Sequence, residues 1–104
     1  MKQITEDMFD SALAISRAVL VDFTAVWCPP CHAMKPALER LSAERADVDV
    51  VEIDVEQCPQ VAERYGVRAM PTLILFRGGS PIAQLVGAQS RERLDAWLDD
   101  KLGR

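Results

Sequence analysis

Two cysteines separated by two prolines constrain this chain more than any other feature. Residues 27–31 have the sequence Trp-Cys-Pro-Pro-Cys, between an apolar run that ends at Val26 and a helical pattern that begins near Pro29. One turn of helix brings two cysteines at this spacing close enough for a disulfide with little backbone movement. A C-x-x-C between a strand and a helix is typical of a dithiol redox site. We therefore expect a reversible disulfide at the start of a helix.

Composition limits the other possibilities. The 104 residues, 49% of them hydrophobic, predict one domain over residues 1–104 with one ordinary core. A formal net charge of −4, with acids and bases interspersed, argues against nucleic acid or a membrane as partner. Because no run is apolar enough for a transmembrane helix or a signal peptide, we expect a cytoplasmic protein. Three cysteines are too few for a disulfide scaffold and suit a reducing compartment.

The periodicity of apolar residues predicts an α/β fold. Strands are expected over residues 19–26 and 48–55, and the helix between them is typical of a right-handed parallel crossover. The second strand alternates apolar with acidic residues, which predicts that it is less enclosed than the first. Further helices are expected from Thr5, from Pro59 to Gly66 and from Ser90, with a hairpin of residues 72–76 and 81–86. The elements predict a mixed sheet of about four or five strands with helices on both faces.

Asp22 is the one charged residue in the first strand. Burial disfavours an ionised carboxylate, so we expect its pKa to be raised. A carboxyl group with a raised pKa near Cys31 could take and return the proton of that thiol at neutral pH. The alternative is a solvated or hydrogen-bonded aspartate with no part in the chemistry.

The chain resembles thioredoxins along nearly its full length. The resemblance rests on motifs that are weak singly and specific in this order and spacing. They are Val21-Asp22-Phe23 with Asp22 six residues before Cys28, the Trp-Cys-x-Pro-Cys core that contains Pro30, Pro36 five residues after Cys31, Tyr65-Gly66-Val67-Arg68, Met70-Pro71-Thr72, Gly78-Gly79 and Val86-Gly87-Ala88. The resemblance implies the thioredoxin fold and an oxidoreductase that acts as an electron carrier through a redox-active disulfide, with no bound cofactor or metal.

The resemblance also implies roles for the reactive residues. At the start of a helix, the helix dipole and unpaired amides lower the pKa of Cys28 and make it the nucleophile that attacks a protein disulfide. Cys31, expected to be more enclosed, would then resolve the mixed disulfide. In the family, the residue at Asp22 exchanges the proton of the second cysteine. Pro36 is expected to kink the helix that carries the cysteines.

The same resemblance implies a surface for client proteins. A generic X-Pro bond favours trans, but the family has a cis bond before Pro71, whose ring packs against the disulfide. The backbone of Met70 would then be free to pair with an extended client segment. Trp27, Met70 and Gly87 would line a shallow apolar surface around Cys28, although Trp27 fits a core position equally well. Electrons would come from an NADPH-dependent thioredoxin reductase, and we expect a monomer.

Four residues depart from the common family pattern. Pro29 replaces Gly, Thr24 replaces Trp, and Glu52 and His32 each replace Lys. Pro29 removes an N–H that could face the Cys28 sulfur and stiffens the loop, so we expect a shifted reduction potential of undetermined sign. Glu52 would raise the pKa of Asp22 further if its side chain points toward it. His32 is expected to be an exposed helix residue, but when protonated it could favour the Cys28 thiolate.

Several alternatives remain at this stage. Cys58 is expected to be structural, or else a regulatory thiol that pairs between chains under oxidation. A zinc site would need Cys58 and His32 beside the Cys28–Cys31 pair. Two other functions remain open. One is a specialised, more oxidising thiol–disulfide exchanger, which is a variant of the disulfide reductase. The other, of a different class, is a thioredoxin-fold binding or scaffold module in which the dithiol is incidental. A glutaredoxin fits the motif and the preceding tryptophan less well.

Overall fold

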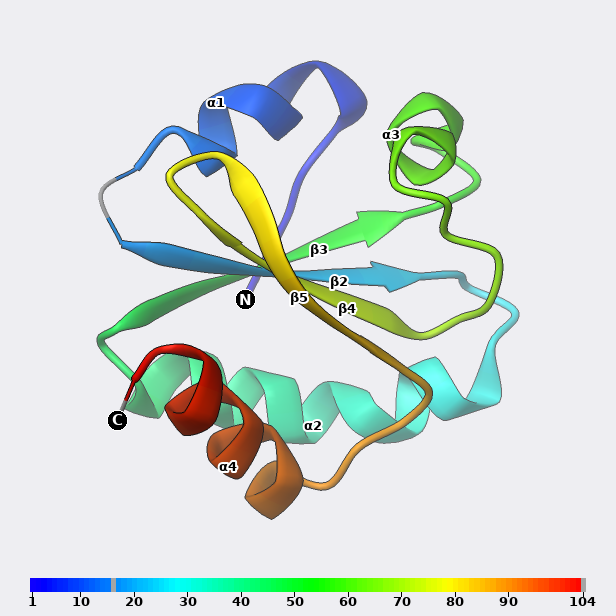
Figure 1. Cartoon of the computed structure of the whole chain (residues 1–104). Coiled ribbons are helices and arrows are strands. Elements are labelled where there is room, and N and C mark those ends of the chain that lie inside the picture. The colour runs from blue at the N-terminus through cyan, green and yellow to red at the C-terminus, as the bar shows by residue number, and fades with distance from the viewer. Residues whose placement is uncertain (16, 104) are drawn as a thin grey trace.

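A five-stranded mixed β-sheet forms the centre of the protein (Figure 1). The computed structural model describes residues 1–15 and 17–103, so Arg104, the last residue of the expected domain, lies outside the described residues. The strands are β1 (Lys2–Gln3), β2 (Ala18–Thr24), β3 (Val48–Asp54), β4 (Thr72–Arg77) and β5 (Ser80–Val86). Their order is β1-β3-β2-β4-β5, with β1, β3 and β2 parallel and β4 and β5 antiparallel to their neighbours. The predicted mixed sheet, parallel crossover and hairpin are confirmed.

Helices cover both faces of the sheet, as predicted. They are the 3₁₀ turn η1 (Glu6–Met8), α1 (Phe9–Leu13), α2 (Pro29–Glu44), α3 (Pro59–Arg64) and α4 (Arg91–Lys101). Figure 1 shows α1 and α3 on one face and α2 and α4 on the other. None of the helices in the described part of the chain is long and apolar enough to cross a membrane.

Two apolar clusters form because side chains of a strand alternate between the faces of a sheet. From β2, Val19, Val21 and Phe23 join the cluster under α1 and α3, whereas Ala18 and Leu20 join the cluster with α2 and α4. From α2, the second cluster contains Met34, Leu38 and Leu41, and from α4 it contains Leu94 and Leu98. Continuing this alternation, Asp22 lies on the face covered by α2, the helix that carries the cysteine pair.

Strand β3 is more enclosed than predicted. Glu52 and Asp54 are only 9% and 4% exposed, so the expectation of a partly open strand is wrong. At Glu52 the cover includes β1, which pairs with the outer edge of β3 with Lys2 opposite Val51 and Gln3 opposite Glu52. A two-residue strand is too short to produce a periodic pattern, so β1 has no signal in the sequence.

Local signals set the limits of the helices. The hydroxyl of Ser90 accepts a hydrogen bond from the amide of Arg93, as expected of a helix cap. Thr5 occupies the cap position of η1, but its hydroxyl donates to the carboxylate of Asp7 and makes no capping bond. Helix α2 continues through Pro36, and the kink at that residue stays a prediction.

The β4–β5 hairpin ends the sheet on one side. Gly78 and Gly79 form its turn with φ of 61° and 80°, a conformation that glycine adopts at low cost. Just after the turn, Pro81 pairs with Phe76, and the register shifts between Leu75 and Phe76. The second residue of β5, Pro81, therefore has no N–H and lies opposite an irregularity in the ladder.

Candidate active site

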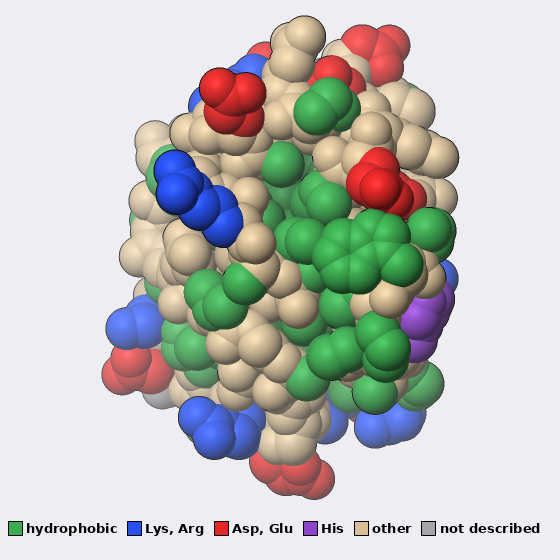
Figure 2. Space-filling view, turned by 90° about the vertical axis from the view of Figure 1, so that its right-hand side faces the viewer, with side chains coloured by type: hydrophobic (Ala, Val, Ile, Leu, Met, Phe, Trp, Pro, Cys, Tyr) green, Lys and Arg blue, Asp and Glu red, His purple; other side chains and the backbone are tan. Residues whose placement is uncertain are grey.

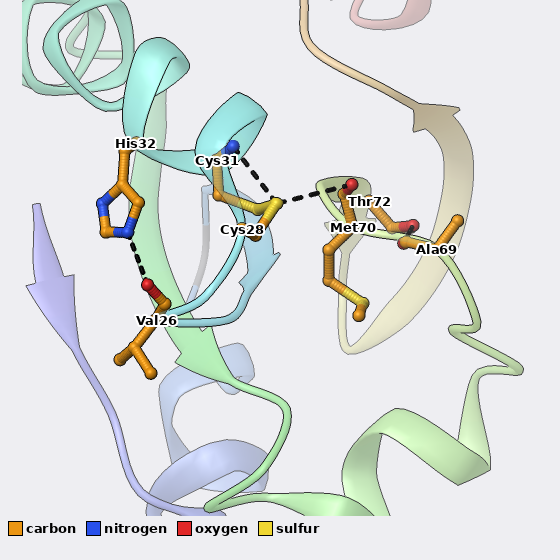
Figure 3. Close-up of a disulfide and its surroundings, with 7 residues drawn as sticks. All are labelled: Val26, Cys28, Cys31, His32, Ala69, Met70 and Thr72. Carbon is orange, nitrogen blue, oxygen red and sulfur yellow. Dashed lines mark hydrogen bonds between the residues drawn. A yellow bond between two sulfur atoms is a disulfide. The ribbon is translucent and has the colours of Figure 1, made fainter.

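The two cysteines lie where the chain leaves β2 and enters α2. Cys28 is the N-cap of α2 and forms a disulfide with Cys31, with a Cα–Cα distance of 5.3 Å (Figure 3). Its Sγ accepts a hydrogen bond from the amide of Cys31 at 3.3 Å. Pro29 and Pro30 occupy the first helical positions, where their fixed φ suits the helix and their missing N–H is least costly. The Cys31 amide is therefore the first N–H of the helix that can reach the sulfur.

Both cysteines are equally enclosed in this oxidised state. Each is 3% exposed, so the expectation that Cys31 is the more enclosed of the two is wrong here. The disulfide holds both residues in one small cluster with Ala25, against which Val55 and Met70 pack.

The two sulfurs nevertheless have different surroundings. Cys28 Sγ lies 3.6 Å from the carbonyl oxygen of Met70, a contact that becomes a hydrogen bond only when Cys28 is a thiol (Figure 3). Cys31 instead lines a cavity of about 190 Å³. Its other lining residues include Thr24, Val26, His32, Lys35, Glu52 and Asp54. The inner cysteine therefore faces a polar cavity, and the outer one faces the segment before β4.

The segment before β4 contains a cis peptide bond between Met70 and Pro71, which agrees with the resemblance and not with the general trans preference. Pro71 is buried, and its carbonyl accepts a hydrogen bond from the amide of Gly87 at 2.8 Å. Within residues 1–15 and 17–103, no backbone-to-backbone hydrogen bond uses the N–H or the C=O of Met70. The fold thus brings Met70 to the cysteine pair, next to Pro71 and its bond to Gly87. No backbone hydrogen bond from the other described residues uses the Met70 backbone.

The surface around the pair is apolar. Val26 and Trp27 are 70% and 59% exposed, and Pro29 and Pro30 are also exposed. Figure 2 shows hydrophobic side chains gathered on this face beside the single histidine of the chain. The core position considered for Trp27 is therefore wrong. Pro36, also exposed, lies further along α2.

The carboxyl group of Asp22 is buried on the sheet face covered by α2. It is 1% exposed, and its Oδ1 has no hydrogen-bond partner among the described residues. Its pKa is raised to about 7, chiefly by burial and then by the charge of Glu52, while the charge of Lys35 acts in the opposite direction. Glu52 is the register partner of Asp22 on β3, and its carboxylate lies 3.8 Å from the Lys35 ammonium. The predicted direction of the Asp22 pKa and the predicted effect of Glu52 are both confirmed.

Cys58 takes no part in this site. It is 1% exposed within the cluster under α1 and α3, and burial raises the pKa of its thiol, with the Glu6 and Asp54 carboxylates adding to the effect. This burial supports a structural role for Cys58 over pairing with another chain. In the part of the chain that the structure describes, no three His, Cys, Asp or Glu side chains are grouped as metal ligands, so the considered zinc set is not assembled.

His32 has a contact that sequence reasoning missed. Its ring is exposed, as expected, but Nε2 lies 2.6 Å from the carbonyl oxygen of Val26. Val26 precedes the helix, so the periodicity of α2 contains no signal for this pair.

Comparison with known proteins gives one consistent result. The thioredoxin family model matches residues 1–100. A thioredoxin of Alicyclobacillus acidocaldarius is 43% identical over 100 residues, which are 95% of each chain. Thioredoxin C-2 of Corynebacterium nephridii is 42% identical over 100 residues, 94% of this chain and 93% of its own. A thioredoxin of Echinococcus granulosus is 41% identical over 88 residues, 85% of this chain and 82% of its own.

Proposed function

This chain belongs to the thioredoxin family and is a thiol–disulfide oxidoreductase that acts on disulfide-containing client proteins, and we propose that it reduces them with Cys28 as nucleophile and Cys31 as resolving thiol. The observation that carries this assignment is the position of the pair. Cys28 lies at the N-terminus of α2, and its Sγ accepts a hydrogen bond from the Cys31 amide. Both features favour a thiolate at Cys28.

The reaction transfers two electrons in two exchange steps. The Cys28 thiolate attacks one sulfur of the client disulfide, the client S–S bond breaks, and the first client sulfur leaves as a thiolate that takes a proton. Cys31 then loses its proton and attacks Cys28 Sγ. The mixed disulfide breaks, the second client sulfur leaves as a thiolate that takes a proton, and the Cys28–Cys31 bond seen in the structure forms. The dithiol is oxidised and the client is reduced.

We propose Asp22 as the group that accepts the Cys31 proton. It lies on the sheet face covered by α2, and its pKa of about 7 allows it to take and return a proton near neutral pH. The absence of a hydrogen-bond partner for Oδ1 among the described residues leaves that oxygen free to accept.

Client binding is proposed to use backbone pairing beside an apolar surface. An extended client segment would pair with the N–H and C=O of Met70, next to the cis Pro71 and to Gly87. Main-chain hydrogen bonds of this kind accept many sequences. Exposed Trp27 would supply apolar contact area, which suits unfolded client segments.

The prolines of the motif are proposed to tune the potential. The Cys28 sulfur accepts a hydrogen bond from the amide of Cys31. Pro29 and Pro30, which lie between the two cysteines, have no N–H and cannot donate to it. Replacing Pro29 by Gly restores one donor and loosens the loop, so the reduction potential of the pair should change. Equilibration with a glutathione buffer measures it, and an equal potential in both proteins contradicts the proposal.

We further propose that electrons come from an NADPH-dependent thioredoxin reductase, that the protein acts as a cytoplasmic monomer without a bound cofactor, and that its domain spans residues 1–104. The family match supports the first point. Oxidation of NADPH in the presence of a thioredoxin reductase and a protein disulfide tests the electron donor. Light scattering at increasing concentration tests the monomer.

The reduction of insulin tests the central proposal. With dithiothreitol as electron source, the protein should accelerate insulin precipitation, and Cys28→Ser should abolish the acceleration. Cys31→Ser should accumulate a mixed disulfide with the client, because its resolving thiol is missing. Alkylation of the reduced protein followed by mass mapping should label Cys28 before Cys31 and Cys58.

No acceleration by the wild-type chain would favour the binding or scaffold module instead. A potential far above that of a disulfide reductant would favour the more oxidising exchanger.

A further inference from the structure

The side chain of His32 connects α2 to the turn that precedes it. The backbone N–H of His32 donates to the carbonyl of Cys28 at 3.2 Å, an ordinary helical bond. The ring reaches further back, to the carbonyl oxygen of Val26 at 2.6 Å (Figure 3). A carbonyl oxygen can only accept, so Nε2 carries the proton in this contact.

The turn that His32 contacts has little other support. Strand β2 ends at Thr24, and the backbone bond from the Cys28 amide to the Ala25 carbonyl, at 3.2 Å, closes the turn. Val26 and Trp27 project from it and are the two most exposed large hydrophobic side chains among the described residues. Across residues 1–15 and 17–103, the His32 ring is the one side chain that hydrogen-bonds to the backbone of this exposed pair.

We propose that His32 is a positioning residue for client binding, because its bond to the Val26 carbonyl holds the turn that presents Trp27 beside Cys28. The proposal rests on the proposed function, in which Trp27 contacts clients. Without the bond, the turn samples more conformations and must be ordered when a client binds. The free-energy cost of ordering the turn weakens client binding and does not affect the bond-exchange step, so KM should rise while kcat is unchanged.

A second effect of His32 would be purely electrostatic, since a positive charge near the helix start favours the Cys28 thiolate. The two effects differ in their substrates. A charge effect changes attack on every disulfide, including a small one. A positioning effect changes only the reactions in which the client contacts the turn.

Three substitutions separate the bond from the bulk of the side chain. The amide nitrogen of glutamine lies near the place of Nε2, whereas that of asparagine lies near Nδ1 and cannot reach Val26. His32→Gln should therefore retain the contact, and His32→Asn and His32→Ala should lose it. Arg40→Gln, an exposed change on the same helix, is the control.

The experiment measures kcat and KM for insulin, and the rate constant for hydroxyethyl disulfide, a small neutral substrate. His32→Ala and His32→Asn should raise the insulin KM by about 3- to 10-fold, the range expected for one hydrogen bond. His32→Gln and Arg40→Gln should match the wild type, and all variants should reduce hydroxyethyl disulfide equally. An unchanged KM in His32→Ala, no rescue by glutamine, or an equal loss on both substrates would overturn the proposal.

A second readout is independent of turnover. In a Trp97→Phe background, Trp27 is the only tryptophan, and its fluorescence anisotropy reports its local mobility. The anisotropy should fall in His32→Ala and His32→Asn and stay at the wild-type value in His32→Gln. If insulin reduction fails in the wild type, the proposed function fails, while the anisotropy still decides whether His32 holds the turn. Equal anisotropy in all variants rejects that role.

Discussion

Replacing Asp22 by Asn should stabilise the protein in a pH-dependent way. The carboxyl is 1% exposed, and its pKa is raised from the ordinary 3.8 to about 7, chiefly by burial. Between these two values the folded protein keeps the proton on Asp22 while the unfolded chain has lost it. Raising the pH through this range therefore favours the unfolded chain.

The magnitude follows from the difference between the two pKa values. At about 1.4 kcal/mol per pKa unit, ionisable Asp22 lowers the free energy of unfolding by about 4 kcal/mol once the pH exceeds 7. Below 3.8 the carboxyl is protonated in both states and has no such effect. Asparagine resembles the protonated acid in shape and has no charge, so the variant should match the wild type in acid and exceed it at neutral pH.

Urea unfolding at a series of pH values measures the effect. The stability difference between Asp22→Asn and the wild type should grow from near zero at about pH 4 to about 4 kcal/mol at about pH 8 and then stay constant. Titrating groups that do not interact with Asp22 cancel in this difference. A difference that is independent of pH would refute the reasoning, because it would mean that Asp22 has the same pKa in both states. Insulin reduction by the same variant should be slower, since the proposed proton acceptor is gone.

Three further predictions follow from contacts near the site and in the core. Glu52→Gln should lower the pKa of Asp22 and Lys35→Gln should raise it, since their charges act in opposite directions; NMR titration of the Asp22 carboxyl carbon measures both, and shifts of the same sign would contradict the assignment. Cys58→Ser should leave non-reducing gels of the oxidised protein unchanged, because the thiol is buried, and a wild-type dimer that the variant lacks would show access. Leu38→Ala should cost about 2–5 kcal/mol in denaturant unfolding, as expected for a fully buried leucine, and a loss near zero would mean that the core refills the space.

Much of the fold could be predicted because its main elements have strong local signals. The run over β2 is nearly all apolar because both faces of the strand are covered. The cap at Ser90, the proline at the start of α3 and the turn at Gly78 and Gly79 each satisfy a backbone requirement that few other residues meet. The cysteine spacing predicts the position of the site, because one helical turn brings the two sulfurs close together.

What could not be predicted depends on contacts between segments. At Glu52 the enclosure of β3 includes β1, whose two residues, Lys2 and Gln3, are polar and exposed. Both cysteines are equally buried in one cluster, against which Met70, distant in sequence, packs. The hydrogen bond from His32 to Val26 links a helix to the turn before it, so no periodic pattern of residues predicts it. The cis bond between Met70 and Pro71 was predictable only from the family resemblance, because X-Pro bonds in general prefer trans.

Strand β5 is the outer strand next to β4, and its second residue is a proline opposite a register shift. Exposed strand edges tend to recruit extended chains and cause aggregation, and prolines and bulges reduce this tendency. A protein that acts on client proteins brings other chains to its surface and is exposed to that hazard. Pro81, opposite Phe76 near the end of β4, therefore protects this edge from foreign strands. The Met70 backbone, just before the start of β4, makes no backbone-to-backbone hydrogen bond among the described residues, and we propose that client segments pair there instead.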